Sequence, residues 1–160
     1  MRKQKGFSLI ELLIVVAIIL IIAAIAIPNL LRSRMAANEA SAVGSIRTIN
    51  TAEVTYSAAY PDIGFTTTLS YLSGPTASCT GAGANSTQAC LIDNVLGNGT
   101  KSGYTFSLAG GSTNPNYTFN DTANPVNRGQ SGQRGFYSDQ TGVIRYDATS
   151  TATSASNPLQ

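Results

Sequence analysis

The N-terminal part of the chain is apolar with almost no interruption. From Leu12 to Leu31 there are about 20 residues without a charge, and most are Leu, Ile, Val or Ala. That length is roughly what an α-helix needs to cross the hydrocarbon core of a bilayer. A helix that is apolar on all sides must be covered by lipid or by other protein. The pattern therefore predicts a membrane-spanning helix that lipid or further copies of the chain must cover.

The helical pattern continues past Pro28, where it becomes amphipathic. Residues 29–59 contain no proline and one glycine, Gly44. Apolar residues recur there at spacings of three, four and seven, which places them on one face of a helix. They are Ala42, Ile46, Ile49, Tyr56 and Tyr60. A proline inside a helix removes one backbone hydrogen bond, so we expect a kink at Pro28.

A change in composition marks the end of this helix and the start of a head. Tyr60-Pro61 ends it, because a residue before proline is disfavoured in the α region. Gly, Ser, Thr and Asn then dominate, with short helical pieces expected at 68–72 and 90–96. Strands are expected at Tyr104–Leu108, Tyr117–Asn120, Gly135–Ser138 and Val143–Tyr146. The predicted fold class is α+β: a long N-terminal helix whose amphipathic half packs on a small antiparallel sheet of three or four strands.

The charges are few and unevenly placed. Arg2, Lys3 and Lys5 crowd the start of a 160-residue chain of net charge +2. Without a leader ending at Gly6, seven basic and eight acidic residues remain. A nearly neutral body argues against a nucleic-acid binder that works by phosphate neutralisation, and the basic start fits a flank that stays cytoplasmic. Histidine is absent, and we find no nucleophile–base pair, phosphate loop or metal-ligand cluster, so we expect no enzyme, no cofactor and no metal site.

The chain contains two cysteines, Cys79 and Cys90, in a Gly/Ser/Thr-rich stretch. If the N-terminal segment carries the rest of the chain out of the cytoplasm, a disulfide between them is the expected state. Two free, partly buried thiols are the alternative. A zinc site fits less well, because two sulfurs without histidine leave the coordination unfilled.

Glu11 places a carboxylate at the entrance of the apolar run. An ionisable side chain beside a membrane segment usually has a partner. A secretory signal peptide would explain the basic start and the small residues of Ala24-Ile25-Ala26, but its apolar core is normally about 7–15 residues. A plain membrane anchor explains the length and the basic flank. Neither interpretation gives Glu11 a role.

The segment Lys5-Gly6-Phe7-Ser8-Leu9-Ile10-Glu11 resembles the processing site of type IV prepilins and of type II secretion pseudopilins. The resemblance implies that a prepilin peptidase cuts between Gly6 and Phe7 and that the new Phe7 amine is N-methylated. It also implies that Glu11 faces the terminal amine of a neighbouring subunit during assembly. Pro28 matches the kink position of that family's long helix.

The expected organisation follows from these patterns and from the resemblance. A leader covers residues 1–6, and the helix has a membrane-spanning or filament-core half at 7–31 and an amphipathic half at 32–60. The head covers 61–147. The Ser/Thr/Ala-rich tail at 148–160 is expected to be flexible.

The function implied by the resemblance is that of a structural pilin subunit. Such a subunit waits in the inner membrane as a single-pass protein and polymerises with its copies into an extracellular pilus for adhesion, motility or DNA uptake. Its expected partners are the prepilin peptidase, membrane lipid and an assembly platform driven by a separate ATPase. The alternatives are a type II secretion pseudopilin and, in another class, a membrane-anchored binding module that never polymerises.

Two weaker signals lie in the head. Arg128 and Arg134 flank a Gly/Ser loop that a filament could offer to DNA, and Asp139 and Asp147 flank a strand-like segment that suggests calcium. Two arginines or two carboxylates in turns are more often solvated turn residues. We therefore give DNA little weight as a partner and expect no calcium site.

Overall fold

The computed structural model describes residues 7–75, 79 and 83–159 of the chain. The chain divides into two compact units, Met1–Arg34 and Met35–Gln160. The helix α1, Leu9–Ala59, contributes residues to both units.

In the first unit, the described residues form the apolar part of α1. The large apolar side chains from Leu9 to Leu31 are 40% to 75% exposed. By length and composition α1 can cross a membrane, and its most apolar stretch buries no residue within the chain. The apolar helix is as predicted, and its place in a membrane stays a prediction. Pro28 lies inside α1 with helix on both sides, and the kink there also stays a prediction.

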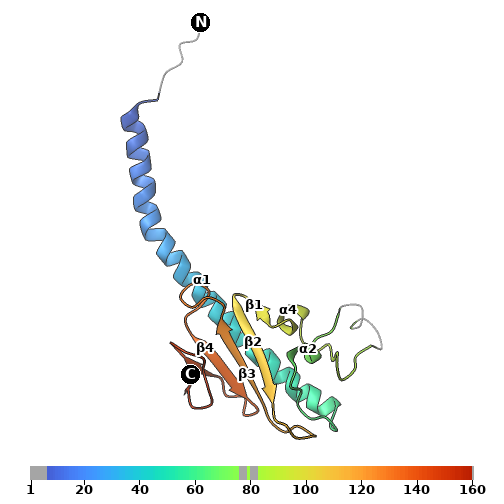
Figure 1. The fold of residues 1–160 in the computed structure, drawn as a ribbon. Coiled ribbons are helices and arrows are strands. Elements are labelled where there is room, and N and C mark those ends of the chain that lie inside the picture. The colour runs from blue at the N-terminus through green and yellow to red at the C-terminus, as the bar shows by residue number, and fades with distance from the viewer. Residues whose placement is uncertain (1–6, 76–78, 80–82, 160) are drawn as a thin grey trace. The chain divides into compact units, whose positions relative to one another are not determined.

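In the second unit, six strands form one antiparallel sheet in the order β1-β2-β3-β4-β5-β6 (Figure 1). The strands are Thr100–Lys101, Tyr104–Gly110, Phe119–Pro125, Gly135–Asp139, Arg145–Asp147 and Asn157–Pro158. Each strand pairs with the next one along the chain, so the sheet is a meander. The longest pairing aligns Tyr104 of β2 with Pro125 of β3 and Gly110 with Phe119.

One face of this sheet packs on α1. Alternate residues of β2 and β3 are buried, as expected for strands with one covered face: Tyr104, Phe106 and Leu108, with Phe119, Asp121 and Ala123. All of these except Asp121 share a hydrophobic core cluster with the apolar stripe of α1: Ala42, Ile46, Ile49, Ala52 and Tyr56. Each fully buried large apolar side chain contributes about 1.5–3 kcal/mol. The predicted α+β fold class is confirmed.

The sheet has more strands than the pattern predicted. β1 is a two-residue strand joined to β2 by the turn Ser102-Gly103, in which both residues have positive φ. Two positive φ values are typical of the type I′ turn that closes tight hairpins. Two-residue strands carry no alternating pattern, and for that reason periodicity did not reveal β1.

The C-terminal segment, for which composition predicts a flexible tail, makes backbone hydrogen bonds to the sheet, and its flexibility stays a prediction. Residues 157–158 form β6, which pairs with β5. The backbone N–H of Leu159 donates to the carbonyl of Ile144 at 2.8 Å, and Ala152 is buried. Backbone hydrogen bonds hold this segment, and composition does not report them.

The two short helices are α2, Leu69–Leu72, and α4, Asn94–Gly97. The helix α4 starts later than predicted, because the N–H groups of Leu91 and Ile92 donate instead to the carbonyl of Leu72. Asp93 caps α4, and its side chain accepts from the N–H of Leu96.

Cys79 and Cys90 form a disulfide, with their Cα atoms 5.6 Å apart. The predicted pair is therefore confirmed, and neither the free thiols nor a zinc site applies. The bond lies before the sheet in sequence. Among the described residues, the disulfide joins Cys79 to Cys90, and both lie in the segment that follows α2.

Candidate functional site

The first candidate site is the start of α1. Gly6 lies outside the described residues, and Phe7 is 75% exposed just before the helix. Ser8 is the residue before the first helical one, and Glu11 is the third residue of α1. The sequence thus places the carboxylate in the first turn, where backbone N–H groups have no helical partner.

Glu11 turns back to this unpaired end of the helix. The backbone N–H of Ser8 donates to Glu11 Oε2 at 3.0 Å, and the N–H of Leu12 donates to the carbonyl of Ser8 at 3.2 Å. A Glu that reaches back from the third helical position is half of a capping box. A negative side chain in the first turn also interacts favourably with the helix dipole. The spacing Ser-x-x-Glu is the sequence signature of this cap, and our sequence analysis missed it.

The cap lies next to the bond at which the resemblance places the cleavage. The backbone nitrogen that precedes Ser8 N is that of Phe7, which would become the terminal amine if the chain were cut after Gly6. The carboxylate of Glu11 already lies at this end of the helix and is exposed. It is therefore accessible to a cation brought by another molecule.

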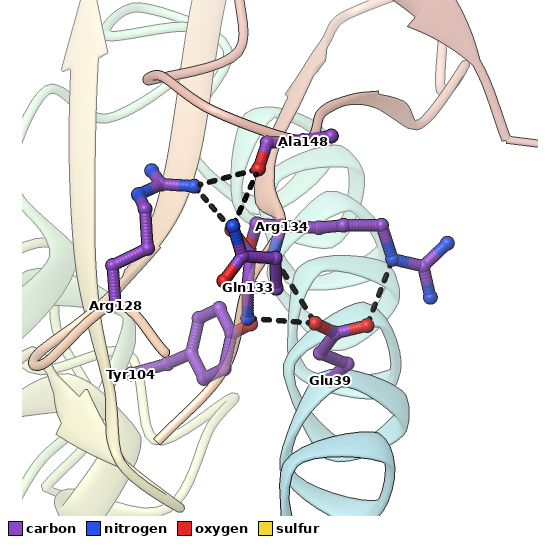
Figure 2. Close-up of polar contacts among 6 residues, drawn as sticks. All are labelled: Glu39, Tyr104, Arg128, Gln133, Arg134 and Ala148. Atoms are coloured by element: carbon purple, nitrogen blue, oxygen red, sulfur yellow. Dashed lines mark hydrogen bonds and ion pairs between the residues drawn. The ribbon is translucent and has the colours of Figure 1, made fainter. Parts of the chain in front are cut away.

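The second polar site lies in the head, where Glu39 of α1 meets the segment before β4 (Figure 2). Glu39 Oε1 accepts from the backbone N–H groups of Gln133 at 2.8 Å and Arg134 at 3.1 Å. Glu39 Oε2 accepts from Arg134 Nε at 2.8 Å. We call Glu39, Gln133 and Arg134 the helix anchor. Its members are far apart in sequence and show no local motif, so sequence reasoning did not find it.

The helix anchor keeps its carboxylate ionised. Burial alone would raise the pKa of Glu39, but the hydrogen bonds from Gln133 and Arg134 and the Arg134 charge outweigh it and lower that pKa. The guanidinium of Arg134 also lies over two rings, 5.5 Å from the Phe136 centroid and 5.4 Å from that of Tyr146. Such stacking fixes the plane of the guanidinium toward the carboxylate.

The loop beside the helix anchor is closed by Arg128 and Tyr104. The guanidinium of Arg128 donates to the carbonyls of Gln133 and Ala148 (Figure 2). It also donates to the carbonyl of Ser150. The hydroxyl of Tyr104 donates to the carbonyl of Arg134 at 2.9 Å. The two arginines that we considered for DNA thus both bond within the head.

The carboxylates considered for calcium close local turns. Asp139 accepts from the N–H of Thr141 at 2.9 Å, and Asp147 accepts from those of Thr149 at 2.8 Å and Ser150 at 2.7 Å. These backbone bonds lower the pKa of Asp147 to about 2. Within the described residues, no three His, Cys, Asp or Glu side chains gather as a metal would require.

Comparison with known proteins bears on the N-terminal site. Residues 1–27 match the family of the prokaryotic N-terminal methylation motif. Over 39 residues the chain is 67% identical to the type IV wide pilus major component PilA4 of Thermus thermophilus, a match that covers 24% of this chain and 30% of that protein. Over 54 residues it is 43% identical to the type IV major pilin protein PilA of Myxococcus xanthus, covering 34% of this chain and 24% of that protein. No solved structure matches the chain.

The matched stretches are short, and the chain spans less than a third of the length of these curated relatives. Both relatives are named as pilus components. The methylation motif covers the residues on which the sequence resemblance rests, from Lys5 to Glu11. The chain is thus similar to type IV pilins over the stretches that these matches cover.

Proposed function

We propose that this chain is a structural pilin subunit that is cut between Gly6 and Phe7, N-methylated at Phe7, held in the inner membrane and polymerised into an extracellular type IV pilus. The observation that carries the proposal is Glu11, an exposed carboxylate in the first turn of an exposed apolar helix. The methylation motif over residues 1–27 supports the processing step.

Processing would create a positive charge at Phe7, close to Glu11 in the sequence. Cleavage turns the peptide nitrogen of Phe7 into an ammonium group, and methylation of an amine keeps its charge. In a low-dielectric setting an ammonium–carboxylate pair is favourable, whereas either member alone is costly to bury. A neighbouring subunit's amine therefore competes with the Ser8 N–H bond to Glu11, the one bond to its carboxylate among the described residues.

The apolar half of α1 allows the subunit to move from membrane to filament at small cost. Its side chains are covered by lipid before assembly and by the helices of other copies afterwards. Lipid tails and apolar side chains are similarly apolar surroundings for the helix. Helix packing and the pairing of Glu11 therefore decide the register of one subunit against the next. A prepilin peptidase, an assembly platform and a separate ATPase are the partners that this function requires.

Mass spectrometry of the N-terminus of the protein recovered from cells tests the proposal directly. We expect a mature chain that begins at Phe7 and carries one methyl group on its amine. A mature chain that begins at any other residue would overturn the proposal.

Two alternatives share parts of this chemistry. A type II secretion pseudopilin would be processed in the same way, and an anchored binding module would stay monomeric. Filaments sheared from the cell surface should contain this chain if it is a pilin. A processed chain that is absent from sheared filaments, and whose loss blocks protein secretion, would identify a pseudopilin instead.

A further inference from the structure

Four polar side chains lie together between α1 and the sheet. Asn50 Nδ2 donates to the hydroxyl of Ser138 at 2.8 Å, and Ser138 of β4 is directly opposite Asp121 of β3. Glu53 follows Asn50 by one helical turn. Asp121, Ser138 and Glu53 have no exposed surface. We call Asn50, Glu53, Asp121 and Ser138 the buried acid cluster.

The buried acid cluster is short of hydrogen-bond donors. Glu53 Oε2 accepts from the backbone N–H of Thr66 at 2.9 Å. Four other buried oxygens of the cluster have no partner among the described residues: Asn50 Oδ1, Glu53 Oε1 and both Asp121 carboxyl oxygens. All four are acceptors if the acids are ionised. An ionised carboxylate buried without a partner costs several kcal/mol, so the cluster needs protons or a cation to complete it.

Within the part of the chain that the structure describes, no basic side chain supplies that charge. The neighbouring charges that act on the two acids are both negative. The carboxylate of Asp121 raises the pKa of Glu53, and the carboxylate of Asp139 raises the pKa of Asp121. In the described ion pairs, Arg134 bonds to Glu39 and Lys101 to Asp93.

The other titratable groups on the packed elements are neutral or act elsewhere. Among them, Tyr56 of α1 and Tyr137 of β4 have raised pKa values and stay neutral, and the charge of Arg145 of β5 acts on Tyr137. None of them brings a positive charge to the buried acid cluster.

Burial therefore decides the protonation of the pair. It raises the pKa of Asp121 to about 7 and that of Glu53 to about 8. The two acids are coupled, because the charge of Asp121 further raises the pKa of Glu53.

We propose that Glu53 and Asp121 are neutral carboxylic acids in the folded head, and that their ionisation loosens α1 from the sheet as the medium becomes alkaline. A neutral acid supplies an O–H donor, which is what the buried acid cluster lacks. The proposal concerns the head alone and does not depend on filament assembly.

A metal cation completes the cluster less well than protons do. Calcium takes six to eight oxygen ligands, and the unpaired oxygens come from three side chains.

The sign of the pH effect follows from the raised values. In the unfolded chain the two acids titrate near 4.5 and 3.8, far below their values in the folded head. The folded state then binds more protons at these two sites. Their contribution to the free energy of unfolding is therefore highest in acid and falls as pH rises from about 4 to about 8. Each group increases the unfolding constant by up to about tenfold per pH unit in this window.

Urea unfolding of the full chain in detergent, from pH 5 to pH 8, tests the proposal. We expect the unfolding constant of the wild-type protein to rise at least about 100-fold between pH 5 and pH 7. The double variant Glu53→Gln, Asp121→Asn keeps the shape of the neutral acids and should lose most of that rise. The control Asp62→Asn replaces an acid by its amide in the exposed turn after α1, and it should keep the rise of the unfolding constant with pH.

Infrared spectroscopy of the wild-type protein provides a test that does not need the variants to fold. A protonated carboxyl band should persist at pH 6, weaken toward pH 9 and be absent from the double variant. A missing band, or a pH dependence equal in the wild type and the double variant, would overturn the proposal. Stabilisation by calcium over EDTA in the wild type alone would also overturn it, in favour of a metal site.

Discussion

The helix anchor makes a quantitative prediction about the stability of the head. Glu39 accepts three hydrogen bonds, two from backbone N–H groups and one from Arg134. Hydrogen bonds to a charged group contribute about 1.5–3 kcal/mol each, but these three share one carboxylate and are not additive. Gln133 is exposed and the side chain of Arg134 is 38% exposed, so water replaces part of what is lost. We therefore expect Glu39→Ala to lower the free energy of unfolding by about 2 kcal/mol.

Glu39→Gln separates the shape of the side chain from its charge. The amide oxygen still accepts from the backbone N–H groups, whereas its NH₂ group cannot accept from Arg134 Nε. The expected loss is about 1 kcal/mol, which urea unfolding followed by tyrosine near-ultraviolet circular dichroism resolves as a midpoint shift of about 0.3–1 M. Asp62→Asn removes the same charge from an exposed turn and should have an effect below about 0.5 kcal/mol.

The effect of pH has a definite sign at this site. The pKa of Glu39 is lowered in the folded head, so its contribution is present above its unfolded value of 4.5 and is lost as pH falls through the folded value. The difference between wild type and Glu39→Gln should therefore shrink in acid. If both Glu39 variants unfold like Asp62→Asn at neutral pH, the anchor contributes no stability and the reasoning is refuted.

Three further predictions follow from single positions. Glu11→Gln keeps an acceptor for the Ser8 N–H but loses the charge, and Glu11→Ala loses both. Immunoblots of sheared filaments should therefore show less of this chain in both variants. Normal filaments in Glu11→Gln would leave capping as the whole role of Glu11. Gly64→Ala should cost more than about 2 kcal/mol in urea unfolding, because φ is +78° and a Cβ would lie 2.1 Å from the carbonyl oxygen of Asn116. Gly44→Ala should stabilise the monomeric head by about 0.5–1 kcal/mol, because this helical glycine has nothing within 4 Å of an added Cβ; a loss of stability there would contradict the structure.

The helix and the order of the main strands could be predicted because their signals are local. The spacing of Ala42, Ile46, Ile49 and Tyr56 is set by one helix face, and all four are buried. The disulfide was predictable from the compartment that the N-terminal segment implies. By contrast, β1 and β6 have two residues each and depend on hydrogen bonds to a neighbouring strand. No periodicity exists over so short a length.

The polar contacts inside the head were not predictable for a related reason. Glu39 bonds to residues more than ninety positions away, and Glu53 lies near Asp121 only because α1 packs on β3. Long-range pairs of this kind leave no spacing in the sequence. The Glu11 cap was different, because Ser8 and Glu11 are near neighbours whose spacing is itself the signal.

The three glutamates of α1 show how the surroundings separate roles that sequence alone cannot. Glu39 has its charge balanced by Arg134, and Glu53 lies where no positive charge acts on it. Neither is accessible to another molecule, because both side chains are buried in the head. Glu11 is exposed, and among the described residues the bond that holds it comes from one neutral backbone N–H. In the filament that we propose, an accessible and weakly held carboxylate is the one that a second subunit's amine can reach. On that proposal Glu39 fixes α1 to the head, Glu53 lies inside the head as a neutral acid, and Glu11 is left for assembly.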